Sequence, residues 1–388
     1  MEILFVSHKY PPAIGGMEKQ SYELINGMRK YATVHTIIYD GKGNKLLFFA
    51  SLQRHIVNIC RQYPNISVVH FNDGLIAAVC SFHTGYKHLR RTVTLHGLDV
   101  VFPGKMFRKY VLPKFNDFDQ IFTVSQATAD ACRQLGLHEK LLTVVPNGVD
   151  TTIGLTDTQN NAQPLAGNDF FTNRTRVFVA MGRPVKRKGF SWLIENVVPK
   201  LHGDFVVLFI GPMKKRTDSQ SILLAMLPRN LQHKIALFLG APTDERNIRV
   251  LLKTEALQNK VHHLGKLPFP EIARLLQRAD YFLMPNIPVS GDMEGFGLVC
   301  LEAALCGATV IAANTDGIPD AVHNGKNGLL LPAGDVGAWV TFLNNLSVSP
   351  QAQKLTRRDV RNYTLENFGW DKMVHKYWQH LNHPEHVV

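Results

Sequence analysis

Two glutamates, Glu294 and Glu302, are the side chains of this sequence best placed for chemistry. Glu294 is followed directly by Gly295, Phe296, Gly297 and Leu298, a segment that contains two glycines. The apolar run Leu298–Leu305 predicts a short helix that is stopped by Gly307. The glycines allow a close approach to the backbone, and the start of a helix attracts phosphate through its free N–H groups and its dipole. An anion site between two carboxylates fits a ligand with both phosphate and hydroxyl groups, such as a nucleotide sugar.

A basic loop follows the apolar run Val177–Met181, with Gly182-Arg183 at its start and Lys188-Gly189 at its end. Ligands of open α/β sheets bind beyond the carboxyl ends of strands. Arg183 can hold two diphosphate oxygens at once, and Lys188 adds a compact charge. Two fixed cations stabilise a departing diphosphate without a metal ion, so we expect neither metal nor cofactor. A solvated basic loop is the alternative interpretation.

The N-terminal half offers two further candidates. Gly15-Gly16 begins the first predicted helix, and it lacks the Gly-x-Gly-x-x-Gly pattern of dinucleotide oxidoreductases. A plain turn is the alternative there. His96 ends the apolar run Arg91–Leu95 and is expected at the carboxyl edge of that strand, although a lone histidine is more often structural. Asp99 either caps the next segment or touches substrate.

A metal site at the adjacent His262 and His263 is not expected, because neighbouring residues of a strand point to opposite faces. The five cysteines form no Cys-x-x-Cys pair and are odd in number. We therefore expect free thiols in a reducing compartment.

These motifs, with the strand-like Ala308–Ala312 and the stretch Asn324–Leu331, resemble the retaining glycosyltransferases of family 4, which have the GT-B architecture. The resemblance covers nearly the whole chain. It implies transfer of a sugar from a nucleotide-diphosphate sugar to a glycan or lipid-linked acceptor, in cell-envelope polysaccharide or lipopolysaccharide synthesis. It also implies retention of anomeric configuration, by same-face attack assisted by the leaving diphosphate. Glu294 as a covalent nucleophile is the alternative mechanism.

The resemblance assigns roles to single residues. Catalysis falls to His96, beside the transferred sugar, and to Glu294, which holds that sugar with the Gly295–Leu298 loop. The remaining residues bind other parts of the donor. Arg183 and Lys188 bind the diphosphate, Glu302 binds the ribose, backbone groups near Leu267 hold the base, and the Gly16 N–H donates to a phosphate. Pro146–Asp150 resembles the turn that ends the family's first domain.

Short apolar runs alternate with amphipathic stretches, which predicts an α/β fold of two doubly wound, Rossmann-like domains facing across a cleft. We expect domains at residues 1–165 (acceptor) and 174–365 (nucleotide sugar), joined through the polar segment 151–173. The predicted strands are Ile3–Val6, Val34–Tyr39, Val68–Phe71, Arg91–Leu95, Gln120–Val124, Leu142–Val145, Val177–Met181, Phe205–Ile210, Val261–Leu264, Tyr281–Met284, Thr309–Ala312 and Gly328–Leu331.

The last segment, 366–388, predicts an amphipathic helix with apolar residues Met373, Tyr377, Trp378 and Leu381 at helical spacing. The resemblance implies that this helix crosses back onto the N-terminal domain. An ordinary helix of the second domain is the alternative.

The composition of the 388 residues, 45% hydrophobic and 19% charged, is that of a soluble globular protein. No run reaches the roughly 18–20 apolar residues of a membrane span. The short apolar start after Glu2 predicts a buried strand and not a signal peptide, so we expect a cytoplasmic location, peripheral on the inner face of the plasma membrane.

A formal net charge of +12 predicts anionic partners. Nucleic acid is not expected, because no zinc-finger spacing or RNA-binding aromatic signature is present. The stretch His83–Lys114 holds Lys87, Arg90, Arg91, Lys105, Arg108, Lys109 and Lys114 against one acid, with aromatic residues between. An anionic membrane surface is the predicted partner, and a solvated positive face is the alternative.

Two rival functions remain at this stage. One is another enzyme of the same fold, such as an epimerase or a phosphorylase, although a phosphorylase needs a pyridoxal phosphate lysine and usually a longer chain. The other is a non-catalytic glycan- or membrane-binding protein, against which the intact motif residues argue. The sequence leaves the base open between UDP, GDP and ADP.

Overall fold

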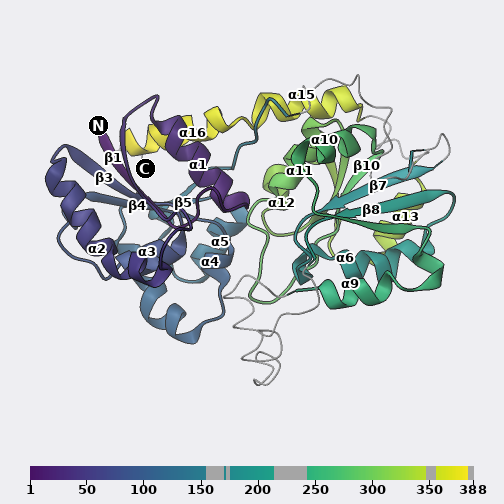
Figure 1. Cartoon of the computed structure of the whole chain (residues 1–388), viewed down its shortest axis with the longest axis horizontal. Coiled ribbons are helices and arrows are strands. Elements are labelled where there is room, and N and C mark those ends of the chain that lie inside the picture. Colours follow the sequence, from purple (N-terminus) through teal and green to yellow (C-terminus); the bar gives the residue numbers. More distant parts are fainter. Residues whose placement is uncertain (154–169, 172–174, 214–242, 347–354, 383–388) are drawn as a thin grey trace. The chain divides into compact units, whose positions relative to one another are not determined.

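The computed structural model describes residues 1–153, 170–171, 175–213, 243–346 and 355–382. The chain divides into two compact units, the first made of residues 1–149 and 368–388 and the second of residues 150–367. Each unit is a six-stranded parallel sheet with helices on both faces (Figure 1). The division lies at the start of the expected 151–173 linker, and most of that linker lies outside the described residues.

The sheet of the first unit has the strand order β2-β1-β3-β4-β5-β6. Its strands are β1 (Glu2–Ser7), β2 (Thr33–Ile38), β3 (Ile66–Phe71), β4 (Arg90–Leu95), β5 (Gln120–Thr123) and β6 (Leu142–Val144). Its helices are α1 (Gly16–Met28), α2 (Lys45–Gln62), α3 (Gly74–Cys80), α4 (Leu98–Val101), α5 (Gln126–Gln134) and α16 (Trp370–Asn382), with short 3-10 or π turns at Phe107–Val111, Leu112–Asp117 and Glu139–Leu141. The chain order of the strands reverses between β1 and β3.

The sheet of the second unit has the order β12-β11-β10-β7-β8-β9, which is the 3-2-1-4-5-6 order of a Rossmann fold. Its strands are β7 (Arg176–Met181), β8 (Phe205–Ile210), β9 (Val261–Gly265), β10 (Tyr281–Met284), β11 (Thr309–Asn314) and β12 (Gly328–Pro332). Its helices are α6 (Phe190–Trp192), α9 (Glu245–Leu251), α10 (Phe269–Arg278), α11 (Leu298–Leu305), α12 (Ile318–Ala321), α13 (Val336–Asn344) and α15 (Arg357–Asn367), with short 3-10 or π turns at Lys186–Lys188, Leu193–Val197, Val198–Lys200 and Glu255–Leu257. The order reverses between β7 and β10.

All twelve predicted strands are present, within two residues at each end, and the prediction of two doubly wound, Rossmann-like domains is confirmed. The central strands are buried on both faces, so their apolar residues run without interruption. Side-chain caps fix several helix starts, as where Asp73 accepts hydrogen bonds from the backbone N–H groups of Leu75 and Ile76. The cysteines are all free, as expected. No helix in the described ranges has both the length and the apolar character needed to span a bilayer.

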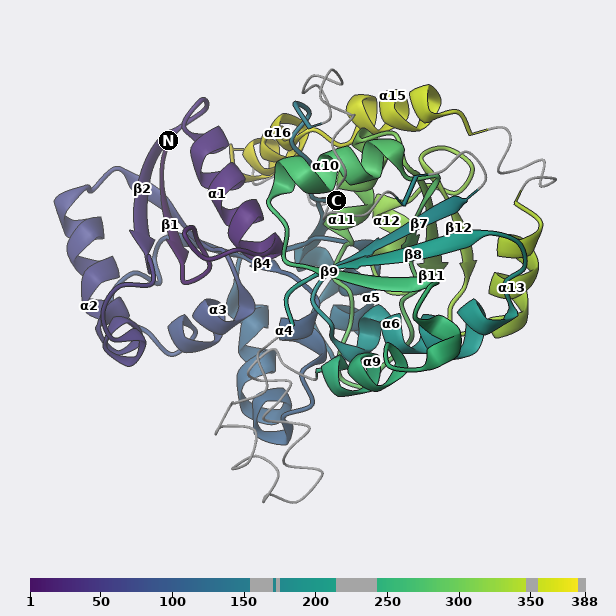
Figure 2. The same ribbon diagram turned by 45° about the vertical axis from the view of Figure 1, so that its right-hand side comes forward.

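Helix α16 belongs to the first unit, where it lies beside α1 (Figures 1 and 2). Its apolar stripe buries Met373, Tyr377 and Leu381. The Tyr377 hydroxyl lies 2.8 Å from the Thr94 hydroxyl on β4 and accepts a hydrogen bond of 3.4 Å from the Gln20 amide on α1. Helix α16, the last of the chain, is therefore a structural part of the first unit.

Tyr377→Phe tests how firmly this helix is held. We expect the free energy of unfolding to fall by about 1–3 kcal/mol, because two buried polar groups lose their common partner. Chemical denaturation measures the change, and Tyr22→Phe, at a side chain that is 43% exposed, is the matched control. Equal stability of the two variants would show that the Tyr377 hydroxyl does not anchor α16.

Candidate functional site

The reversal of strand order between β7 and β10 marks the site of the second unit, because ligands of doubly wound sheets bind at the carboxyl ends of the strands at such a point. The basic loop 182–189 leaves β7, and the loop 285–297 leaves β10. The loop 315–317 leaves β11, the next strand along. Residues from all three loops meet around Glu294.

Four charged side chains of alternating sign form a charge cluster here, in the order Asp292, Arg187, Glu294 and Lys188. Lys188 Nζ lies 2.7 Å from Glu294 Oε2, and Arg187 Nε lies 3.4 Å from the same oxygen. Arg187 Nη1 donates to both carboxylate oxygens of Asp292 at 3.2 Å. The four side chains are between 1% and 13% exposed. Each charge is thus removed from most of the solvent and paired.

The cations decide the ionisation of Glu294. Burial alone would raise the pKa of this carboxyl, but the charges of Lys188 and Arg187, with hydrogen bonds from Lys188 and Asn286, lower it to about 2. The side chain is therefore a carboxylate at neutral pH. A carboxylate accepts hydrogen bonds and cannot donate one, so it can bind ligand hydroxyl groups.

The loop after β11 fixes the backbone of Glu294 on both sides. The Glu294 N–H donates to Asp316 Oδ2 at 3.0 Å, and the Gly317 N–H donates to the Glu294 carbonyl at 2.9 Å. Asp316 has φ 52°, the one positive φ outside glycine among the described residues. Aspartate tolerates this left-handed conformation better than most residues. Burial raises the pKa of the Asp316 carboxyl.

Glycine is required where the basic loop turns into α6. Gly189 has φ 66°, and a Cβ there would lie 1.9 Å from the Pro285 carbonyl oxygen. The close approach brings the end of the β7 loop against the start of the β10 loop. Lys188 and Glu294 come from these two loops, so any larger residue at position 189 would push them apart.

The remaining predicted donor residues lie in the same unit. Leu298 begins α11 as expected, Gly297 precedes it with φ 92°, and the Phe296 side chain is buried, so the Gly295–Leu298 loop exposes mainly backbone. Glu302 is half-buried on α11, and Arg183 is exposed at the end of β7. Leu267 is half-buried between β9 and α10.

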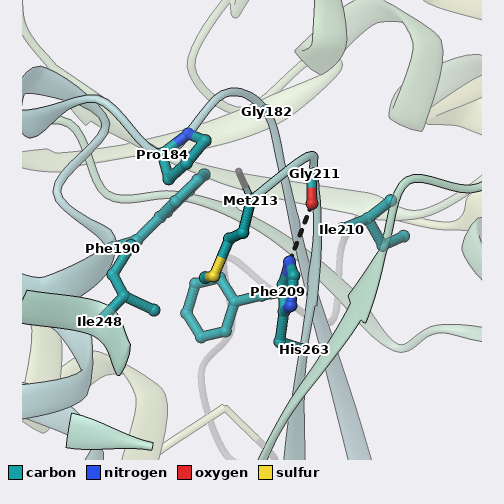
Figure 3. Close-up of a pocket in the computed structure, with 9 residues that line it drawn as sticks. All are labelled: Gly182, Pro184, Phe190, Phe209, Ile210, Gly211, Met213, Ile248 and His263. Carbon is teal, nitrogen blue, oxygen red and sulfur yellow. Dashed lines mark hydrogen bonds between the residues drawn. The ribbon is translucent and has the colours of Figure 1, made fainter. Parts of the chain in front are cut away.

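A small hollow, partly open to solvent, lies at the carboxyl ends of β7 and β8 (Figure 3). Its lining is mostly apolar and consists of Gly182, Pro184, Phe190, Phe209, Ile210, Gly211, Met213, Ile248 and His263. His263 Nε2 donates to the Gly211 carbonyl at 2.8 Å, whereas His262 contacts the Phe170 ring. A Cβ added at Gly182 would lie 3.4 Å from Lys188 Cε, so the hollow adjoins the charge cluster.

The first unit places His96 at the carboxyl end of β4, as predicted. Its Nε2 lies 2.8 Å from the Asn72 carbonyl oxygen, which can only accept, so Nε2 is the donor of this hydrogen bond. Asp99 accepts hydrogen bonds from the N–H groups of His96 and Gly74, which gives it a structural role. Gly16 is exposed as the first residue of α1.

A histidine–aspartate pair lies at the reversal point of the first sheet. His8 follows β1, Asp73 follows β3, and His8 Nδ1 lies 2.9 Å from Asp73 Oδ2. Both side chains are about 3% exposed. Burial alone would raise the pKa of the Asp73 carboxyl. The interactions with His8 and the hydrogen bond from the Ile76 N–H have the larger effect, so the pKa is lowered. Asn72, the residue before Asp73, is buried, and neither its amide oxygen nor its amide nitrogen has a hydrogen-bond partner among the described residues.

The site residues that were not predicted from the sequence are Arg187, Asp292, Asp316, His8 and Asp73. Each stands two to eight residues beyond a predicted strand, at the edge where ligands bind. Opposite charges after neighbouring strands were the available signal. Recognising this signal requires the strand order, which places β7 beside β10 and β1 beside β3.

The basic stretch His83–Lys114 is only partly a surface. Arg91 is buried and donates to the Asp117 carbonyl, and Arg90 donates to Gln120 and to the Leu381 carbonyl. These two arginines are structural. The exposed part, here called the basic patch, carries Lys105, Met106, Arg108, Lys109 and Tyr110, whereas Lys114 is half-buried over the Phe82 ring.

Comparison with known protein families gives two matches that do not overlap. The description "Glycosyltransferase Family 4" matches residues 14–153, and "Glycosyl transferases group 1" matches residues 204–347. Together they span most of both units.

Three similar proteins illustrate the comparison. A D-inositol 3-phosphate glycosyltransferase of Corynebacterium jeikeium is 28% identical over 45% of this chain and 43% of its own length. A GDP-mannose-dependent alpha-(1-6)-phosphatidylinositol monomannoside mannosyltransferase of Mycolicibacterium smegmatis is 26% identical over 66% of this chain and 60% of its own. The matches thus span about half the length of these relatives. The crystal structure of Anabaena HepE with UDP-glucose shares the fold, with a TM-score of 0.69 at 19% identity over 98% of this chain and 99% of its own.

Glu294 should make stability depend on pH in the acid range. Its pKa is about 2 in the folded protein and 4.5 when unperturbed, so its contribution is complete above pH 4.5 and is lost as the pH falls toward 2. Over this window we expect the free energy of unfolding of Glu294→Gln to fall by up to about 3 kcal/mol less than that of the unchanged protein. Denaturation at several pH values measures this. Glu255→Gln, at an exposed glutamate, is the control, and equal slopes in both variants would contradict the ion pairing.

Proposed function

Because the chain belongs to the family 4, group 1 glycosyltransferases, we propose that it moves a sugar from a nucleotide-diphosphate sugar to a hydroxyl group of a glycan or lipid-linked acceptor. One observation carries the proposal. At the reversal point of the second sheet, a buried lysine and a buried carboxylate are in contact, at 2.7 Å. A cation for phosphate beside an acceptor for hydroxyl groups is the pair that a sugar diphosphate needs.

The second unit supplies the donor chemistry. Lys188 and Arg183 bind the diphosphate and neutralise the charge that grows as the glycosyl bond breaks. Glu294, ionised at neutral pH, accepts hydrogen bonds from sugar hydroxyls, and the Gly295–Leu298 backbone lies against the sugar. Glu302 accepts from the ribose. The apolar hollow beside Gly182 holds the base near Leu267, and the nucleotide is UDP, GDP or ADP.

The reaction proceeds with retention and without a metal ion or other cofactor. The acceptor hydroxyl attacks the anomeric carbon on the face that the diphosphate leaves, and the leaving phosphate oxygen takes the hydroxyl proton. Lys188 and Arg183 supply the positive charge that a metal ion gives in other transferases. The proposal includes the roles that the family resemblance implies for Gly16, toward the donor phosphate, and for His96, toward the transferred sugar.

Nucleotide binding tests the donor site. We expect Arg183→Ala and Lys188→Ala each to weaken binding of the preferred nucleoside diphosphate by about 1.5–3 kcal/mol, the range of charge-assisted hydrogen bonds. Glu302→Ala weakens it through the ribose. Glu294→Ala spares the free nucleotide and lowers turnover of the nucleotide sugar. Calorimetry with UDP, GDP and ADP in the presence of EDTA measures nucleotide binding in all four variants, and an assay with the corresponding nucleotide sugar measures the turnover of Glu294→Ala.

Lys186→Ala is the matched control, because Lys186 is an exposed lysine of the same loop. Unchanged binding in both cation variants would remove the donor site from this loop. A strict requirement for Mg²⁺ or Mn²⁺ would contradict the metal-free mechanism.

The first unit offers an amphiphilic site for the acceptor. Three of its most exposed apolar side chains, Ile14 (85%), Leu46 (78%) and Leu47 (67%), follow the neighbouring strands β1 and β2 at the carboxyl edge. Lys45 stands beside them and lies over the Phe49 ring, which also contacts His8. Apolar residues with a cation next to a buried histidine–aspartate pair support a lipid-linked acceptor, in keeping with an envelope role.

The basic patch supports attachment to an anionic membrane on the cytoplasmic side. Near such a surface each exposed cation contributes about 1 kcal/mol, and salt screens the attraction. We expect the protein to sediment with vesicles that contain phosphatidylglycerol, at low salt only, and Lys105→Glu with Lys109→Glu to abolish this. The same reversal at Lys200 and Lys253, exposed in the second unit, is the control. Equal binding to neutral and anionic vesicles, or none, would leave the patch a solvated face.

A further inference from the structure

We propose that Arg187 is a positioning residue that holds the Glu294 carboxylate in place while Lys188 binds the donor diphosphate. The inference rests on the proposed function and deepens it. It concerns a residue that the loop motif does not include, because the motif cations are Arg183 and Lys188. Its basis is the sharing of one carboxylate oxygen between two cations.

Glu294 Oε2 has three neighbours, which are Lys188 at 2.7 Å, Arg187 at 3.4 Å and the Asn286 amide at 3.5 Å. The lysine makes the shortest contact, and it is also the residue expected to bind phosphate. A donor diphosphate therefore competes with Glu294 for Lys188. If Lys188 were its only cation, Glu294 would lose its closest partner at the moment when it must hold the sugar.

Arg187 is fixed in a way that Lys188 is not. Asp292, with a side chain 1% exposed, accepts from Arg187 Nη1 with both oxygens at 3.2 Å, while Arg187 Nε points to Glu294. A planar guanidinium that binds two carboxylates at once cannot easily follow an incoming anion. The arginine stays, and the lysine, with its flexible stem, is free to turn to the diphosphate.

When Lys188 turns to the diphosphate, Arg187 remains in contact with Glu294 among the acidic groups of the site. Asp292 lies on the same loop, Asp316 follows β11, Glu302 stands on α11, and Lys188 and Arg187 follow β7. Three of these are carboxyl groups, and a diphosphate adds further negative charge. Without Arg187, a bound donor would drive Glu294 toward protonation, and a protonated carboxyl loses its capacity to accept from two hydroxyls.

The test compares Arg187→Gln, Arg187→Lys and the control Arg249→Gln, at a more exposed arginine of α9. UDP-glucose, GDP-mannose and ADP-glucose are offered to the unchanged protein, and the sugar nucleotide that turns over is used. In Arg187→Gln we expect kcat to fall about 100-fold, the scale of a misplaced group, with an unchanged Kd for the nucleoside diphosphate. The acid limb of the kcat–pH profile moves up toward 4.5, the ordinary pKa of glutamate. Arg187→Lys restores part of both.

A second readout needs no turnover. The carboxyl carbon resonance of Glu294, assigned with Glu294→Gln, is titrated with and without the bound nucleoside diphosphate. In the unchanged protein the pKa stays low on binding, whereas in Arg187→Gln it rises. Identical titrations in the two proteins, or a nucleotide affinity lost in Arg187→Gln as in Lys188→Ala, overturn the inference. Failure of all three nucleotides to bind refutes the proposed function instead, and the titration of the free proteins still decides whether Arg187 holds Glu294.

Discussion

The contact between Lys188 and Glu294 is the interaction on which the rest of the site depends. Both side chains are mostly buried, and a buried charge without its partner costs several kcal/mol. Each therefore requires the other to be in place when the loops after β7 and β10 fold. The same low polarity strengthens the field that a diphosphate would meet. The pair that fixes these two loops thus also holds a buried cation at the carboxyl edge of the sheet.

The backbone around this pair is shaped by a few close approaches. Gly189 lets the β7 loop touch the Pro285 carbonyl, and Asp316 adopts a left-handed conformation to hold the Glu294 N–H. The Rossmann strand order brings β7, β10 and β11 side by side, so their loops meet at one edge. The fold supplies the meeting point, and the loop residues supply its charge.

The strands, the two-sheet fold and the glycosyltransferase family could be predicted from the sequence, because apolar runs and glycine-bounded motifs are local. The helix Leu298–Leu305 was predicted at its observed ends for the same reason. The contact of Glu294 with Arg187 could not be predicted, because Arg187 is 107 residues away and becomes a neighbour only through the strand order. His8 and Asp73, 65 residues apart, were missed likewise. Arg90 and Arg91 look like surface cations in the sequence, yet their partners lie inside the first unit.

The two units carry different chemistry at equivalent points of their sheets. The second has a cation and a carboxylate in direct contact, so it can exchange one anion for another without leaving a charge unpaired. The first has His8, whose Nδ1 contacts the helix-capping Asp73, and His96, whose Nε2 donates to a backbone carbonyl. Such imidazoles can exchange hydrogen bonds with hydroxyl groups. Each unit therefore carries a different kind of polar group at the reversal point of its own sheet.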